Sequence, residues 1–219
     1  MAYKAMGVRG CEGVKWVSVC GDVAKPGVFE ISMGTTYAEM LARCGGPTKG
    51  RKLKAFAPSG PSFPFLPATA EMLNSPIDFP GSKNAPPNPV FDAGAHVGSG
   101  AIIFLHEGRC MLDAALNFTR FFRNESCGKC VPCRVGSQKM VDVIKELRGG
   151  RAAEFDYQQT IDDLADVLKL TSICGLGQVV HKPIQSVLRY WKQEVEDHLH
   201  RRTCPSGVCF SDVAGYGHT

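Results

Sequence analysis

The sequence predicts an α+β fold, in which a small strand-rich domain is followed by a four-helix bundle. Between residues 14 and 57, short β-like runs alternate with turn signals in the order strand, turn, strand, helix, strand, which is typical of a compact α+β unit. After residue 110, apolar residues recur every three or four positions in four successive segments, the pattern of amphipathic helices. A proline-rich stretch separates the two patterns.

The strand-rich part begins with β-like runs at residues 14–20 and 28–31, on either side of the turn signal Pro26-Gly27. A short helix is expected over residues 37–43, because capping threonines precede it and paired glycines follow it. A further strand is expected at residues 53–57. This order of elements suggests a small α+β unit.

Nine prolines fall within residues 58–92. Proline lacks the amide donor and has a restricted φ, so long regular elements are not expected there. Four phenylalanines in this stretch favour an ordered connector that packs against its neighbours, and a flexible linker is the alternative on composition. Residues 101–105 then form a short buried strand.

The four expected helices cover residues 111–122, 132–147, 157–170 and a segment that starts near Pro183. Proline is well suited to the first turn of a helix, and Gly149-Gly150 ends the second helix. Amphipathic helices joined by short connections predict a bundle.

Composition limits the functional classes. The chain has 219 residues, 44% of them hydrophobic, and a formal net charge of +4, so a packed core is expected. There is no apolar run long enough for a membrane span and no signal-peptide pattern, which favours a cytoplasmic protein without direct membrane insertion. The sequence has no stripe of basic residues interleaved with aromatic residues, the pattern that would indicate nucleic-acid binding. Ten cysteines are many for a reducing compartment, and this favours metal binding over disulfides.

The cysteines at positions 127, 130 and 133 stand three residues apart in one short segment. Three thiols in such a loop can face one point, and Cys174, in the turn Ser172–Gln178, is the best candidate for a fourth ligand. Four thiolates commonly hold an iron–sulfur cluster, and the spacing favours one 4Fe-4S cluster. A structural zinc site and unliganded core cysteines are the alternatives.

Positive charge surrounds the three-cysteine loop. Lys129 and Arg134 flank its thiols, and Pro132 marks the start of a helix whose N-terminal amides carry partial positive charge. These features stabilise a negatively charged cluster and tune its potential, so Lys129 and Arg134 are expected to be tuning residues.

A second metal constellation is expected near the end of the chain. Thiolates with one imidazole suit tetrahedral zinc, and the competing prediction is a disordered tail with free thiols. The expected zinc ligands are Cys110, His198, Cys204 and Cys209, with His200 and His106 as rivals of His198 for the imidazole role.

Two family resemblances add to these patterns. The run Val19–Glu30, with Gly34-Thr35-Thr36 and Cys44-Gly45-Gly46, resembles a soluble-ligand-binding β-grasp (SLBB) domain, for which no ligand is assigned. The segments Leu116–Gly136 and Ser172–Gln178 closely resemble the NADH-binding flavoprotein subunit of respiratory complex I, a module that also occurs in NAD-dependent formate dehydrogenases and NAD(P)-linked hydrogenases.

The second resemblance implies that the four cysteines bind a 4Fe-4S cluster that accepts electrons from reduced FMN. It implies further subunits as partners: a flavin-binding half, a thioredoxin-like 2Fe-2S subunit and a large subunit that carries more clusters. The Cys-Pro-Ser-Gly-Val-Cys motif at residues 204–209 favours a formate dehydrogenase or hydrogenase as the parent complex.

The chain departs from that family at one important point. The glycine-rich segment that binds FMN and NADH in the family is absent, and Gly98-Ser-Gly100 lacks the strand and helix context of a phosphate-binding loop. FMN and NAD are therefore expected on a partner polypeptide rather than on this chain.

The leading functional hypothesis is an electron-transfer component of a multisubunit NAD(P)-linked oxidoreductase, without catalytic acid–base residues of its own. The alternative is a zinc-stabilised docking module with no redox role. The expected boundaries are a lead-in at 1–13, the β-grasp domain at 14–67, an ordered proline-rich connector with its strand at 68–105, the four-helix 4Fe-4S domain at 106–202 and a cysteine-containing tail at 203–219.

Overall fold

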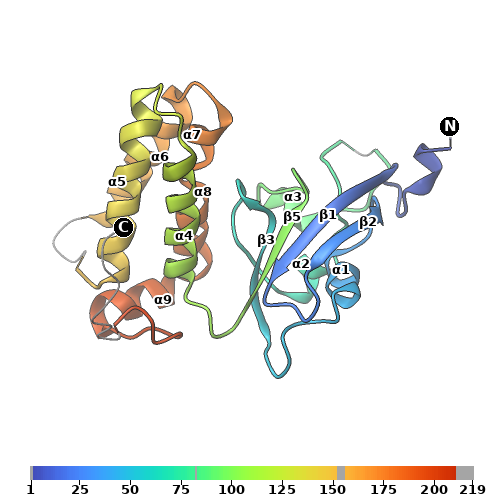
Figure 1. Ribbon diagram of the computed structural model, residues 1–219, viewed down its shortest axis with the longest axis horizontal. Helices are drawn as coiled ribbons and strands as arrows, with labels where there is room; N and C mark the ends of the chain where they lie inside the picture. Colours follow the sequence, from blue (N-terminus) through green and yellow to red (C-terminus); the bar gives the residue numbers. More distant parts are fainter. Residues whose placement is uncertain (1, 82, 152–155, 211–219) are drawn as a thin grey trace. The chain divides into compact units, whose positions relative to one another are not determined.

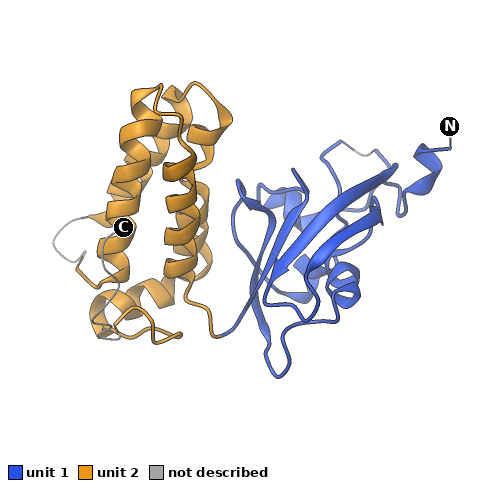
Figure 2. Ribbon diagram, viewed as in Figure 1, with its two compact units in different colours: residues 1–107 blue, residues 108–219 orange. Residues whose placement is uncertain are grey.

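The structure is a computed structural model that describes residues 2–81, 83–151 and 156–210. The chain divides into two compact units, residues 1–107 and residues 108–219 (Figure 2). The first unit contains the sheet and the second is helical, which confirms the predicted α+β class.

The first unit is built on a five-stranded sheet in the order β2-β1-β5-β3-β4 (Figure 1). Strand β1 pairs antiparallel with β2 and parallel with β5, and β3 pairs antiparallel with both β4 and β5. The strands are β1 (Val14–Gly21), β2 (Gly27–Ser32), β3 (Leu53–Pro61), β4 (Leu66–Pro67) and β5 (Ala101–His106).

In the described part of the first unit, four short helices accompany this sheet: η1 (Lys4–Met6), α1 (Tyr37–Arg43), α2 (Ala70–Leu73) and α3 (Pro89–Asp92). Helix α1 begins with a capping box between Thr36 and Glu39, which satisfies two amide donors of its first turn. In the core, the Tyr37 ring packs against Phe56 with a centroid distance of 4.9 Å. Both side chains are fully buried.

The proline-rich stretch leads into the last strand of the sheet. Residues 101–105 form a strand as predicted, but β5 lies between β1 and β3 in the sheet, with Ile102 and Phe104 fully buried. The stretch is thus not only a connector, because it returns the chain to the middle of the sheet. Strand β3 extends into the stretch as far as Pro61, and α2 and α3 have four residues each.

The second unit contains the predicted helices in sequence order (Figure 1). Helix α4 packs against α5 and α8, and α5 packs against α6. The elements are α4 (Met111–Glu125), α5 (Val131–Arg148), α6 (Tyr157–Thr171), α7 (Gly175–Val179), α8 (Lys182–Tyr190), α9 (Lys192–Glu196) and the π-helical turn η3 (Asp197–Arg201).

Two details of the helical unit differ from the sequence-based expectation. The fourth expected helix is interrupted by non-helical backbone at Trp191, which leaves α8 and α9 as separate helices. The short helix α7 was not anticipated, since its five residues include two glycines and show no amphipathic period. No helix in the described ranges has the length and apolar content needed to cross a bilayer.

Candidate metal centres

Three of the four predicted cluster ligands lie on the turn that joins α4 to α5. Cys127 is exposed, Cys130 is the N-cap residue of α5, and Cys133 is buried in the first turn of that helix. Gly128 adopts φ 73°, a conformation that favours glycine, and its amide donates to the Ser126 hydroxyl over 3.3 Å. The turn is therefore held by its own backbone and by Ser126.

The segment that carries Cys174, between α6 and α7, lies beside this turn. Cys174 is the N-cap residue of α7, three residues after the end of α6. A Cβ added to Gly177 would stand 3.0 Å from the Cys133 Cβ and would clash with the Ser172 side chain. The backbone of α7 thus approaches the first turn of α5 more closely than a larger residue permits.

Cys130, before α5, also interacts with the segment that precedes α7. The pKa of its thiol is lowered, first because the Ile173 amide donates to the sulfur and also because the Cys133 amide does so. Ile173 immediately precedes Cys174. Backbone amides that stabilise a thiolate prepare it for metal binding, since metals bind the deprotonated sulfur.

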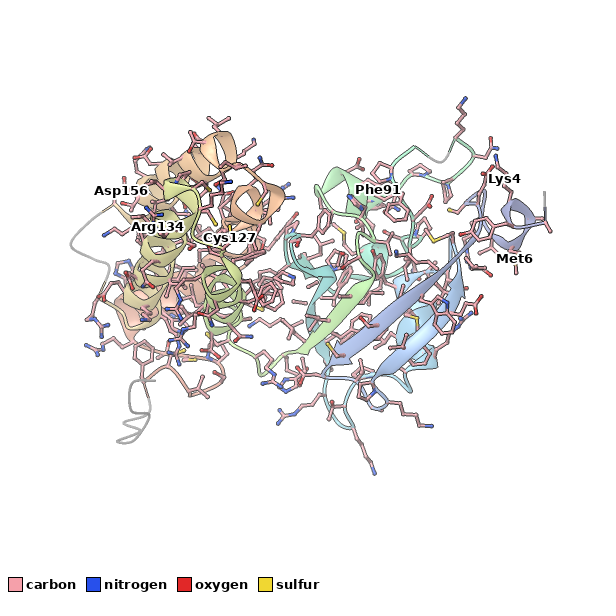
Figure 3. All side chains as sticks on the ribbon, turned by 45° about the horizontal axis from the view of Figure 1, so that its top comes forward. Lys4, Met6, Phe91, Cys127, Arg134 and Asp156 are labelled. Atoms are coloured by element: carbon pink, nitrogen blue, oxygen red, sulfur yellow. The ribbon has the colours of Figure 1, made fainter. Side chains whose placement is uncertain are left out.

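Polar groups around the turn are directed to the cysteines and to their backbone. The Ser126 hydroxyl lies 3.2 Å from the Cys133 sulfur. Arg134 donates to the Gly128 carbonyl over 2.6 Å, and Figure 3 labels Arg134 on α5 and Cys127 in the turn before that helix. Lys129 is exposed. A thiolate-bound cluster requires cysteine ligands, amide donors to sulfur and room for close backbone approach. The four cysteines, the amides at Cys130 and the glycine where α7 meets α5 fit these requirements.

The close approach at Gly177 predicts a specific mutational effect. Gly177→Ala is expected to destabilise the chain by about 1–3 kcal/mol, because the added methyl group overpacks the contact with Ser172 and Cys133. The free energy of unfolding from denaturant titration measures the effect. Gly175→Ala is the matched control, because a Cβ there meets no heavy atom within 4 Å. Equal losses in the two variants would contradict the packing argument.

A second group of ligand atoms gathers elsewhere in the helical unit. The donor atoms of Cys110, His198, Cys204 and Cys209 all lie within 4.8 Å of one another. The Cys110 sulfur is 3.4 Å from His198 Nε2 and 3.6 Å from the Cys209 sulfur. The structure thus brings together the four residues that the sequence nominated for zinc.

The two rival histidines lie outside this group. His106 belongs to the first unit, where its Nε2 is 3.9 Å from Asp22. His200 is exposed and pairs with Glu196 at 3.0 Å. His198, by contrast, is fully buried, and its Nδ1 donates to the Glu194 carbonyl over 2.7 Å. That hydrogen bond fixes the ring so that Nε2 faces Cys110 and, once deprotonated, can bind a metal.

Hydrogen bonds within this group shift the pKa values of Cys110, His198 and Cys209. The pKa of Cys110 is raised, first by its hydrogen bond with the Cys209 sulfur and also by burial. The pKa of Cys209 is lowered, first by that same hydrogen bond. Burial opposes charge on His198, but hydrogen bonds to Cys209 and the Glu194 carbonyl outweigh it and raise the pKa to about 9.

Helix α4 and Arg148 add positive potential to this second group. The Asp113 amide, in the first turn of α4, donates to the Cys110 sulfur over 3.4 Å, and helix N-termini stabilise thiolates. Arg148 interacts with Cys209 and lies 3.0 Å from Asp113. Arg148 and Glu194 had not been identified from the sequence, because their roles arise from contacts between distant segments.

Two protein families match this chain, one in each compact unit. Residues 16–66 match the SLBB domain family. Residues 113–198 match the family described as the NADH-ubiquinone oxidoreductase-F iron-sulfur binding region, and this match includes all four predicted cluster cysteines.

Individual relatives are similar over nearly the whole chain. The F-type subunit of NADH-quinone oxidoreductase from Streptomyces coelicolor is 34% identical over 203 residues, which are 93% of this chain and 43% of the relative. The HndC subunit of the NADP-reducing hydrogenase from Solidesulfovibrio fructosivorans is 29% identical, over 94% of this chain and 40% of its own length. This chain therefore spans less than half the length of these relatives.

Solved structures of an NAD+-reducing [NiFe]-hydrogenase have a similar fold. The air-oxidized state aligns with a TM-score of 0.72 at 31% identity, over 90% of this chain and 32% of the hydrogenase chain. The H2-reduced state aligns with a TM-score of 0.74 at 29% identity.

Proposed function

Because this chain carries an SLBB domain and the iron–sulfur binding region of the NADH-ubiquinone oxidoreductase-F family, we propose that it relays electrons through one 4Fe-4S cluster. The observation that carries the proposal is the convergence of two distant segments. The Ile173 amide stabilises the Cys130 thiolate, and Gly177 packs on Cys133. Cys127, Cys130, Cys133 and Cys174 are the proposed ligands.

The proposed setting is a multisubunit NAD(P)-linked oxidoreductase. Electrons enter from FMN held outside this chain and leave to another cluster on a partner. The proposed partners are a flavin-binding half, a thioredoxin-like 2Fe-2S subunit and a large cluster-carrying subunit. The names of the relatives, which are subunits of NADH-quinone oxidoreductase and NADP-reducing hydrogenase, support this setting, and a formate dehydrogenase in the cytoplasm is a third parent type.

Anaerobic purification of the full chain, with chemical reconstitution of the cluster, tests the proposal. The expected product is a brown protein with about four iron and four sulfide per chain and an EPR signal on one-electron reduction. A colourless protein that holds zinc but no iron would instead support a zinc-stabilised docking module without redox function.

The second group supports a structural zinc ion within the same unit. Its three sulfurs and one imidazole match the donor set of structural zinc sites, and a bound ion would replace the protons that the group otherwise shares. The proposed ligands are Cys110, His198, Cys204 and Cys209. The ion would join the start of α4 to η3 and the chain that follows it.

The positive charge near the proposed cluster predicts a shift in its reduction potential. Lys129→Ala is expected to lower the potential by roughly 10–40 mV, because an exposed charge contributes up to about 1 kcal/mol to the reduced, more negative cluster. Spectroelectrochemical titration at low ionic strength measures the change. Lys139→Ala, exposed two turns further along α5, is the control. Equal potentials for Lys129→Ala and wild type would refute the tuning role.

A further inference from the structure

A series of hydrogen bonds links α6 and α8 with Gln178, in the segment that carries Cys174. Gln185 Nε2 donates to Asp162 Oδ1 over 3.0 Å, and Gln185 Oε1 lies 2.6 Å from His181 Nδ1. His181 Nε2 lies 3.1 Å from the Gln178 carbonyl oxygen. The Gln178 side chain then donates to the Ser172 carbonyl over 3.0 Å. The path is formed by side chains and by the backbone of α7.

The two ends of this path differ in their surroundings. At one end, Asp162 and Gln185 line a surface cavity of about 350 Å³. At the other end, the Gln178 amide donates to the Cys174 carbonyl over 3.3 Å. His181 lies between them and is 8% exposed. The path therefore connects solvent with the backbone of a proposed cluster ligand through one buried imidazole.

The direction of the hydrogen bonds determines which form of His181 the network favours. An ionised carboxylate can only accept, so Asp162 requires the Gln185 amide nitrogen and turns the Gln185 oxygen toward the imidazole. The Gln178 carbonyl oxygen faces the other ring nitrogen. Both nitrogens thus face acceptors, and only the doubly protonated imidazolium donates to both.

Other groups oppose that positive charge. The pKa of His181 is lowered, first by burial and then by Lys182 on its own helix and Lys169 on α6, although the hydrogen bonds to Gln185 and Gln178 act in the opposite direction. Asp162 is a carboxylate near His181, since it accepts from the same Gln185 side chain that contacts the imidazole, and α7 carries no charged side chain. One additional negative charge on a reduced cluster would raise the pKa of His181 and favour its protonation.

We propose that His181 takes up one proton from solvent when the cluster in the Cys174 site accepts one electron. This inference rests on the proposed function. One electron enters the cluster from its donor, one proton binds an imidazole nitrogen of His181, and both leave on reoxidation. The net charge of the helical unit then stays constant during the redox cycle.

Potentiometric titration of the reconstituted full chain between pH 5.5 and 9 tests this coupling. The reduced cluster raises the proton affinity of His181, so the potential falls as pH rises between the two pKa values of the oxidised and reduced states and is flat outside them. Full coupling corresponds to about 59 mV per pH unit, the equivalent of a tenfold change in proton activity for one electron.

His181→Gln is expected to make the potential independent of pH while the EPR spectrum of the reduced cluster stays unchanged. His200→Gln, an exposed histidine in η3, is the control and keeps the wild-type slope. Asp162→Asn retains His181 and is expected to move the sloping region to lower pH, because it removes a negative charge that favours the imidazolium. A purely structural role for His181 would not produce that shift.

The outcomes separate this inference from the proposed function. A chain that holds no iron and sulfide overturns both. A cluster-loaded wild type with a pH-independent potential overturns only the proton coupling, and so does a slope that persists in His181→Gln. If His181→Gln does not fold, Asp162→Asn provides the test. The proton coupling is then overturned when the pH range over which the potential falls is the same in Asp162→Asn as in wild type.

Discussion

Replacing Cys174 with serine is expected to abolish stable cluster binding. The reconstituted chain should fall from about four iron and four sulfide to less than about one of each, with loss of the brown colour and the EPR signal. The serine hydroxyl is a poor replacement for a thiolate, and the remaining three cysteines leave one iron of the cluster without a protein ligand. Iron and sulfide analysis on anaerobic samples measures the effect.

Cys20→Ser is the matched control for this experiment. Cys20 is exposed on β1 in the other unit, so the substitution removes one thiol but no proposed ligand. It should retain the full iron and sulfide content. A Cys174→Ser chain that kept a stable cluster of about four iron would show that another residue completes the ligand set.

Replacing Cys209 with serine is expected to remove zinc and to destabilise the helical unit. The other three donors would remain as protonated or charged groups, with Cys110 and His198 both buried. Structural zinc contributes folding free energy directly, so we expect a loss of several kcal/mol, about 10 °C or more in Tm for a unit of this size. Zinc content and thermal unfolding of the full chain measure the two effects.

Val208→Ala is the control within the same loop, since Val208 offers no metal ligand. It should keep about one zinc per chain and a Tm close to that of wild type. A chelator should lower the Tm of wild type toward that of Cys209→Ser and leave Cys209→Ser itself unchanged. Wild-type protein that binds no zinc, or Cys209→Ser protein that binds it equally, would refute the proposed site.

The sequence predicted most helices of the second unit because their signals are local. The apolar period of α4, α5 and α6 and the proline near the start of α8 are visible within single segments. The break at Trp191 and the short helix α7 were not predicted, since neither has a periodic signal. The central position of β5 was also missed, because strand order depends on contacts between distant residues.

The sequence by itself determined that three thiols share one turn, since their spacing leaves them little freedom to separate. It also determined the types of donor available to both proposed metal sites. Only the tertiary structure decided which distant groups join them: the Ile173 amide at Cys130, Gly177 against Cys133, and His198 beside Cys110. Sequence patterns report local conformation, whereas these contacts depend on how α4 to α9 pack, and that packing also connects His181 with the cysteine turn.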